Sequence, residues 1–191
     1  MGKENRLFEY TPPFVEFPAN PKIIEINGIK VYDYVSPDEM SNYIKEFSKT
    51  IDLNDFDVLL INQKGGRFFA ETLMKLQNYR GSFLNVEYHR DHKIIIPVPE
   101  DIKKLRLGVF DDIWDSGGTP ADILNDAPNS SFVFMTQKEG IEGQILIPRS
   151  RVAIQISNVW VGGCGMNLET EGDGLPKDFA RDYPSLIAKI L

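Results

Sequence analysis

Apolar and polar positions alternate along most of the chain in patterns typical of short strands and amphipathic helices. Apolar runs of strand length occupy residues 56–62, 82–88, 105–110 and 131–136. Helical spacing of apolar residues is found at residues 37–47, 68–76, 120–124 and 178–191. Strands that alternate with helices predict an α/β fold, in which a mainly parallel central sheet carries helices on both faces. The carboxyl ends of such strands meet at one edge, where α/β proteins bind their ligands.

The N-terminal part of the chain predicts an extended arm followed by a hairpin. Several prolines interrupt residues 1–22, which show no clear periodicity, so this segment is expected to lie over the body or over a partner subunit. Two short strands are expected at residues 22–26 and 29–35. They would be joined by Asn27 and Gly28, a favoured pair for a tight hairpin turn.

Length and composition fit one domain. The 191 residues, of which 42% are hydrophobic, are enough to bury a sizeable core. We assign residues 1–28 to the arm and the start of the hairpin, and residues 29–191 to a single domain. Residues 22–35 and 140–175 are expected to form a small hood over the ligand-binding edge of the sheet.

Charge and cysteine content narrow the class of protein. A net charge of −7 and a pI near 4.9 argue against nucleic acid or an acidic membrane as a partner. The single cysteine, Cys164, excludes an intramolecular disulfide, and no N-terminal apolar stretch resembles a signal peptide or a membrane span. We therefore expect a cytoplasmic protein.

Residues 106–124 carry the strongest chemical signal, because a strand, three carboxylates and a Ser-Gly-Gly-Thr turn stand directly before a helix. Gly117 and Gly118 lack a Cβ, so their backbone can aim several N–H groups at one oxyanion, aided by the helix dipole. Ser116 and Thr119 add hydroxyl donors. This turn is typical of a phosphate-binding loop.

Asp111 and Asp112 lie next to the same turn, where they would repel a bare phosphate. They need ribose hydroxyl donors or a hard divalent cation beside them. One ligand satisfies both requirements, namely a phosphorylated ribose with magnesium. The alternative is an acidic loop before a capped helix with no ligand, since Asp, Ser and Gly are ordinary loop residues.

Residues 109–119, VFDDIWDSGGT, resemble the signature by which type I phosphoribosyltransferases bind 5-phosphoribosyl pyrophosphate (PRPP). The resemblance implies the type I phosphoribosyltransferase fold. It also implies that Asp111 and Asp112 bind the ribose hydroxyls, and that residues 116–119 clamp the 5′-phosphate. Asp115 would bind PRPP and act as the catalytic residue, which accepts or relays the N7 proton of a purine while N9 attacks.

Two further segments resemble pyrophosphate-binding loops of the same family. KGGRFFAETL resembles its first PRPP loop, in which Lys64, Gly65 and Gly66 would bind pyrophosphate, although a plain strand-to-helix turn is the alternative. HRDHK lies where the family has a mobile lid, and Arg90 is the candidate cation there.

The segments after residue 136 resemble the base-binding elements of the purine enzymes. Lys138 follows a strand and would contact the O6 atom of a 6-oxopurine. Trp160, within NVWVGGCGMN, would stack on the base, and the Val161 backbone would read its edge. The alternative is that Lys138 and Trp160 have no role in binding, since lysines often end strands and tryptophans in strands usually belong to the core.

The resemblance implies Mg²⁺ as the cofactor, held by Asp112 and by Asn167, which stands where related enzymes commonly have an aspartate. The chain also departs from the family. No arginine follows in LETEGDGLP, where those enzymes place a second pyrophosphate contact.

The resemblance predicts a purine phosphoribosyltransferase. It would transfer the phosphoribosyl group of PRPP to N9 of hypoxanthine, guanine or xanthine, and it would act as a homodimer or a higher homo-oligomer. One alternative is a phosphoribosyltransferase for another base. Another is a regulator that senses PRPP without catalysis, which the incomplete pyrophosphate contacts favour and the acidic pI disfavours.

Overall fold

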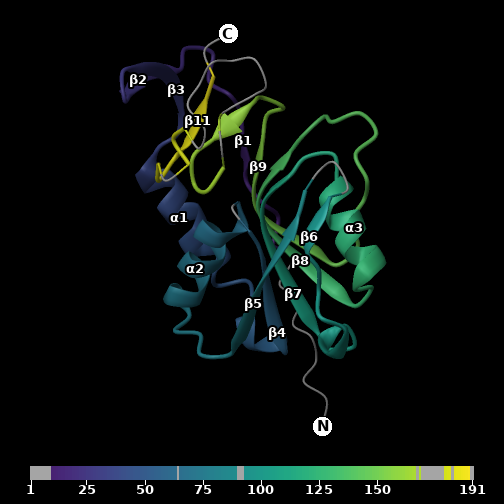
Figure 1. The fold of residues 1–191 in the computed structure, drawn as a ribbon. Coiled ribbons are helices and arrows are strands. Elements are labelled where there is room, and N and C mark those ends of the chain that lie inside the picture. Colours follow the sequence, from purple (N-terminus) through teal and green to yellow (C-terminus); the bar gives the residue numbers. More distant parts are fainter. Residues whose placement is uncertain are drawn as a thin grey trace.

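A computed structural model describes residues 10–63, 65–89, 93–166, 168, 179–181 and 183–189. In these residues a sheet of seven strands has the order β1-β9-β8-β7-β4-β5-β6 (Figure 1). Its neighbours pair in parallel except β5 and β6, which are antiparallel. The strands are β1 (Phe14–Val15), β4 (Val58–Asn62), β5 (Ser82–Tyr88), β6 (Ile94–Ile96), β7 (Leu107–Trp114), β8 (Ser130–Lys138) and β9 (Ser150–Ile156). The predicted mainly parallel sheet is confirmed.

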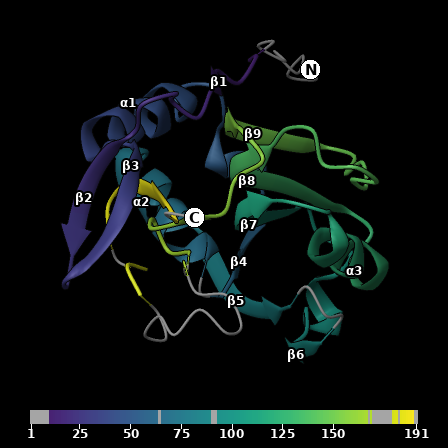
Figure 2. The ribbon, with the colours of Figure 1, turned by 90° about the horizontal axis from the view of Figure 1, so that it is seen from above.

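Helices cover both faces of this sheet, as predicted (Figure 2). Helices α1 (Pro37–Phe47) and α2 (Gly66–Leu76) lie on one face, where Ile44 and Phe69 pack with Ile61 of β4. Helix α3 (Gly118–Asp126) lies on the other face, where Ile123 packs with strand residues. Two short 3₁₀ turns, Leu53–Asp55 and Glu100–Ile102, connect the elements.

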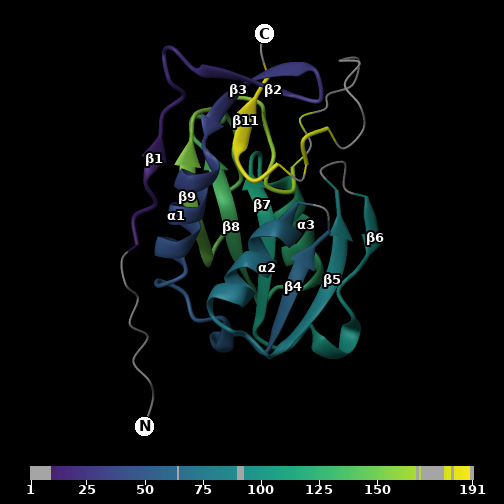
Figure 3. The ribbon, with the colours of Figure 1, turned by 90° about the vertical axis from the view of Figure 1, so that its left-hand side faces the viewer.

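A second, antiparallel sheet lies above the carboxyl ends of the central strands (Figure 3). Its order is β10-β11-β3-β2, formed by β2 (Lys22–Ile26), β3 (Ile29–Val35), β10 (Val161–Gly162) and β11 (Leu186–Ala188). The predicted hairpin is confirmed, because Ile26 pairs with Ile29 across a turn whose Asn27 and Gly28 have positive φ angles of 50° and 80°. This sheet makes a hood over the edge where ligands are expected.

The prediction of a C-terminal helix over residues 178–191 is wrong for the residues that the structure describes. Leu186, Ile187 and Ala188 form strand β11, which pairs with β3 and β10 and is buried throughout. Pro184 explains part of the error, because proline removes a backbone donor and disfavours helix in the residue before it. The spacing of the apolar residues is compatible with a helix, but partner strands distant in sequence decide the conformation.

The segment assigned to the hood at residues 140–175 contains an unforeseen strand of the central sheet. Strand β9 pairs in parallel with β8, so that part of the segment lies in the body. The N-terminal arm continues the same sheet, since Phe14 and Val15 pair with β9. Tyr10 fastens the arm further, because its hydroxyl donates to the Ala153 carbonyl at 2.7 Å.

Strand β7 extends beyond Phe110, where the apolar run ends, as far as Trp114. Its pairing with β8 continues from Asp111, opposite Phe134, to Trp114, opposite Gln137. Asp111 and Asp112, which were expected in a loop, therefore lie in regular strand. Neighbouring strands that satisfy the backbone allow acidic residues to remain in extended structure.

The start of helix α1 offers a test of local stability. The Ser36 hydroxyl accepts from the Glu39 N–H, and the Glu39 carboxylate accepts from the Ser36 N–H, which makes a reciprocal capping box. Replacing Ser36 with Ala should lower the free energy of unfolding by about 1 kcal/mol, measured by urea titration. Ser41→Ala on the exposed side of the same helix is the control, with an expected change within about 0.5 kcal/mol. Equal effects of the two variants would contradict this role for the cap.

Candidate active site

A cavity of about 560 Å³ lies at the carboxyl ends of the central strands, where the motifs singled out in the sequence converge. Segments that end β4, β5, β7 and β8 form its floor, and residues of the hood form its opposite wall. The predicted site residues that line it are Gly65, Asp111, Asp112, Asp115, Ser116, Gly117, Gly118, Thr119, Lys138, Trp160 and Val161.

Asp111 is a buried carboxylate in the middle of the floor, only 7% exposed. The Asn62 side-chain amide donates to its Oδ2 at 3.0 Å, and the Asp112 N–H donates to its Oδ1 at 3.0 Å. Burial and the charge of Asp112 raise the pKa of Asp111 well above its ordinary value, and these hydrogen bonds oppose the rise. A donor or cation from a ligand would therefore be favoured beside this pair.

The first glycine loop packs tightly against β7. A Cβ on Gly65 would lie 1.7 Å from Oδ2 of Asp112, and a Cβ on Gly66 would lie 2.2 Å from the Phe110 carbonyl oxygen. Glycine is required at both positions because backbone and carboxylate already fill the space. Gly65 thereby reaches the cavity, whereas Gly66 opens α2 behind it.

The phosphate-loop candidate joins β7 to α3. Gly117 has a φ angle of 89°, a left-handed conformation that glycine adopts without strain, and Gly118 then begins the helix. The first N–H groups of a helix have no partner inside it and point away from its start. Together with the Ser116 and Thr119 hydroxyls, they give the cavity a set of donors suited to an anion.

Asp115, Lys138 and Trp160 form a polar and aromatic cluster on the other side of the cavity. The Lys138 ammonium is 3.2 Å from Oδ2 of Asp115, and its nitrogen is 5.3 Å from the centre of the Trp160 ring. Lys138 is 5% exposed and lies in the last position of β8. The Trp160 indole N–H donates to the Leu168 carbonyl at 3.1 Å, which fixes the ring in the hood. This cluster can offer a hydrogen-bond donor, an acceptor and a flat apolar face to one planar ligand.

Three predicted site residues, Lys64, Arg90 and Asn167, lie outside the described residues. Asn62 and Arg181 are among the residues that line the cavity although the sequence did not single them out. Asn62 was detectable as the polar end of an otherwise apolar strand. The sequence did not single out Arg181, because residues 178–191 were expected to form a helix. Arg181 follows the LETEGDGLP segment, which contains no arginine.

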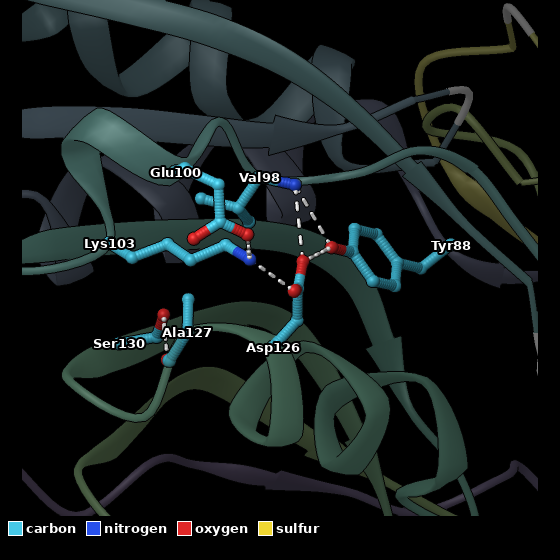
Figure 4. Close-up of polar contacts among 7 residues, drawn as sticks. All are labelled: Tyr88, Val98, Glu100, Lys103, Asp126, Ala127 and Ser130. Atoms are coloured by element: carbon cyan, nitrogen blue, oxygen red, sulfur yellow. Dashed lines mark hydrogen bonds and ion pairs between the residues drawn. The ribbon is translucent and has the colours of Figure 1, made fainter.

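A polar network that includes the cavity residue Tyr88 ties the end of β5 to the end of α3 (Figure 4). The Tyr88 hydroxyl donates to Oδ2 of Asp126 and accepts the Val98 N–H at 3.0 Å. The Lys103 ammonium lies 2.6 Å from Oδ1 of Asp126 and 2.5 Å from the carboxylate of Glu100. Burial and Asp126 together raise the pKa of Tyr88 to about 12, so its hydroxyl stays a donor at neutral pH. The network holds α3, whose start is the phosphate loop.

The described residues contain no group of three or more His, Cys, Asp or Glu side chains placed to hold a metal ion. A divalent cation beside Asp111 and Asp112 would therefore complete its oxygen shell with a bound ligand or water, as magnesium commonly does. None of the helices in the described ranges is long and apolar enough to cross a bilayer.

Comparison with known proteins identifies the fold. No family model and no curated protein sequence matches the chain. Solved structures do match. A hypoxanthine-guanine phosphoribosyltransferase from Bacillus anthracis has a TM-score of 0.67 at 18% identity, over 85% of this chain and 100% of that chain. A hypoxanthine phosphoribosyltransferase from Staphylococcus aureus has a TM-score of 0.65 at 18% identity, over 82% and 89%. The Trypanosoma cruzi enzyme, in complex with its product IMP, has a TM-score of 0.64 at 16% identity, over 89% and 95%. The chain has the type I phosphoribosyltransferase fold.

The network in Figure 4 predicts a pH-dependent contribution to stability. Burial opposes ionisation of Asp126, but the contacts with Lys103 and Tyr88 outweigh it, so the pKa of Asp126 lies below its ordinary value. Ionised Asp126 therefore stabilises the fold fully at pH values above the ordinary carboxyl pKa of about 4. This stabilisation is lost as the pH falls through the lower pKa that Asp126 has in the folded protein.

Asp126→Asn should accordingly lower the thermal unfolding midpoint at pH 7, and the difference from wild type should shrink as the pH falls below about 4. Glu100→Gln is the control, since Glu100 is an exposed partner of the same lysine and should contribute little. A difference that stays constant from pH 7 to pH 3 would contradict this assignment.

Proposed function

We propose that this protein is a purine phosphoribosyltransferase, which transfers the 5-phosphoribosyl group of PRPP to N9 of a 6-oxopurine and releases pyrophosphate. One observation carries the proposal. A single cavity combines the acidic pair and helix start that suit a phosphorylated ribose with the Asp115, Lys138 and Trp160 cluster that suits a purine. The fold shared with hypoxanthine phosphoribosyltransferases supports the same assignment.

The two halves of the cavity would hold the two substrates in line. Residues 116–119 would clamp the 5′-phosphate with backbone and hydroxyl donors, and Asp111 and Asp112 would accept the ribose hydroxyls. Trp160 would stack on the base while Lys138 donates to its O6 atom. Holding both reactants in one geometry removes much of the entropic barrier of a bimolecular reaction.

The reaction breaks the bond between C1′ of the ribose and pyrophosphate, and it forms a bond between C1′ and N9 of the base. Positive charge develops on the ribose in the transition state, where nearby carboxylates stabilise it. Asp115 would accept the proton that leaves N7 as N9 attacks. Its 3.2 Å contact with Lys138 keeps this carboxylate at the side of the cavity where the base would bind.

Mg²⁺ is the proposed cofactor, held by Asp112 and by oxygen atoms of PRPP and water, with Asn167 as a second candidate ligand. The cation would neutralise the pyrophosphate that departs. The carboxylate oxygens in the floor fit such a hard cation. Arg181 would supply the pyrophosphate contact that the LETEGDGLP segment lacks, beside Lys64, Gly65, Gly66 and Arg90. A cytoplasmic homodimer stays a prediction from the sequence.

Release of pyrophosphate should depend on PRPP, on magnesium and on a 6-oxopurine. Hypoxanthine, guanine, xanthine, adenine, uracil and orotate should be assayed in parallel, with turnover expected in one or more of the first three. Turnover with another base alone would overturn the assignment of Lys138 and Trp160. PRPP binding without turnover on any base would favour a sensing role.

Asp115→Asn should lower kcat by about 100-fold, because general acid–base catalysis typically contributes 100-fold or more. The KM for PRPP should change little, since the phosphate and ribose contacts remain. Asp101→Asn is the control, a change of an exposed carboxylate outside the cavity. Near-normal turnover in Asp115→Asn would remove this residue from the mechanism.

Lys138→Met should weaken recognition of the 6-oxo group. The loss of a charged hydrogen bond predicts a fall of roughly tenfold to 100-fold in kcat/KM for hypoxanthine or guanine. Because Lys138 also holds Asp115, kcat/KM for any residual activity on adenine should fall too, but by less. The exposed Lys104→Met serves as control. An equal fall for 6-oxopurines and adenine would show that Lys138 does not read O6.

A further inference from the structure

The connection between β8 and β9 carries Gln144, whose side chain contacts the backbone beneath the base-binding cluster. Its Nε2 donates to the Asp115 carbonyl at 2.7 Å and to the Lys138 carbonyl at 3.3 Å, and it lies 3.5 Å from the Trp114 carbonyl. This half-buried amide thus touches the carboxyl ends of both β7 and β8. Those ends carry the two halves of the Asp115 and Lys138 ion pair.

The residue after Gln144 holds the neighbouring phosphate loop. The Ile145 N–H donates to the Ser116 carbonyl at 2.8 Å, and the Ile145 carbonyl accepts from the Trp114 indole at 3.3 Å. A Cβ on Gly117 would lie 2.8 Å from the same carbonyl. The connection therefore packs directly on the turn that leads into α3.

A row of glutamine side chains determines how the Gln144 amide is oriented. The Gln137 amide nitrogen lies 3.4 Å from Oε1 of Gln144, and the Gln155 amide nitrogen lies 3.3 Å from Oε1 of Gln137. Because Oε1 of Gln144 faces a donor, its NH₂ group is left to face the backbone carbonyls. In this orientation the Gln144 amide can donate to backbone carbonyls at the ends of both β7 and β8.

We propose that Gln144 is a positioning residue for the transfer reaction, which fixes the separation of Asp115 and Lys138 through their backbone carbonyls. The proposal rests on the proposed function. Gln144 acts through these two residues and, in the described part of the chain, does not itself line the cavity. A displacement of about 1 Å in catalytic groups can cost about 100-fold in rate, so a brace at this point has a measurable effect.

Gln144→Leu removes the amide and keeps a side chain of similar bulk. It should lower kcat by about tenfold or more. The KM for PRPP should change less than about threefold, because the Ile145 backbone still holds the phosphate loop. Gln144→Glu keeps the shape but sets a carboxylate against backbone carbonyls, so it should lower kcat at least as far. Recovery of wild-type kcat by the glutamate would show that shape alone matters and would overturn the proposal.

Gln77→Leu is the matched control. The Gln77 amide also joins two backbone carbonyls, those of Ser48 at 2.8 Å and Ile51 at 2.7 Å, but at the far end of α2. This variant should lower the thermal unfolding midpoint and leave kcat unchanged. An equal loss of kcat in Gln77→Leu and Gln144→Leu would mean that general destabilisation explains both, and the positioning role would be wrong.

Deuterium exchange of residues 112–120 in the ligand-free protein tests the brace without any turnover. Gln144→Leu should speed exchange in this segment, and Gln77→Leu should not. If wild type releases no pyrophosphate with any base, the proposed function has failed, and the exchange data alone judge whether Gln144 holds the strand ends. Unchanged exchange in Gln144→Leu would overturn the inference whatever the turnover.

Discussion

Strand β7 pairs in parallel with β4 on one side and with β8 on the other, and this pairing sets the positions of the groups that these three strands carry in the floor. Parallel register brings chemically useful residues from distant parts of the sequence to one edge. Asn62 ends β4, Asp111 and Asp112 lie in β7, and Lys138 ends β8. The backbone remains satisfied by its neighbours, so the side chains are free to face the cavity.

Charge is the second constraint on this site. Asp111, Asp112 and Asp115 line a cavity that is proposed to bind a highly anionic substrate, in a chain whose net charge is −7. Lys138, Arg181 and the positive end of α3 offset part of this repulsion. A cation shared between the carboxylates and the substrate would offset more, which is why magnesium belongs to the proposal. Burial and, after it, the charge of Asp112 raise the pKa of Asp111, so part of this rise comes from the same crowding of negative charge.

Local signals in the sequence predicted much of the fold. Apolar runs located β4, β5 and β8, and the Asn27 and Gly28 turn located the hairpin, because neighbouring residues decide these elements. Strand β11 and the length of β7 could not be obtained in this way, since pairing with distant strands decides both. The same limit applies to side chains. Arg181 and Gln144 look ordinary in the sequence and gain a role through the segments that they meet.

The central claim is that one cavity binds a ribose 5-phosphate and a purine base together. Calorimetric titration with inosine 5′-monophosphate, inosine and ribose 5-phosphate tests it most directly. Because the phosphate loop and the base cluster would act on one molecule, the nucleotide should bind at least about 100-fold more tightly than either part, a difference of about 2.8 kcal/mol. Equal binding of inosine and its monophosphate, or no binding of the nucleotide, would contradict the account.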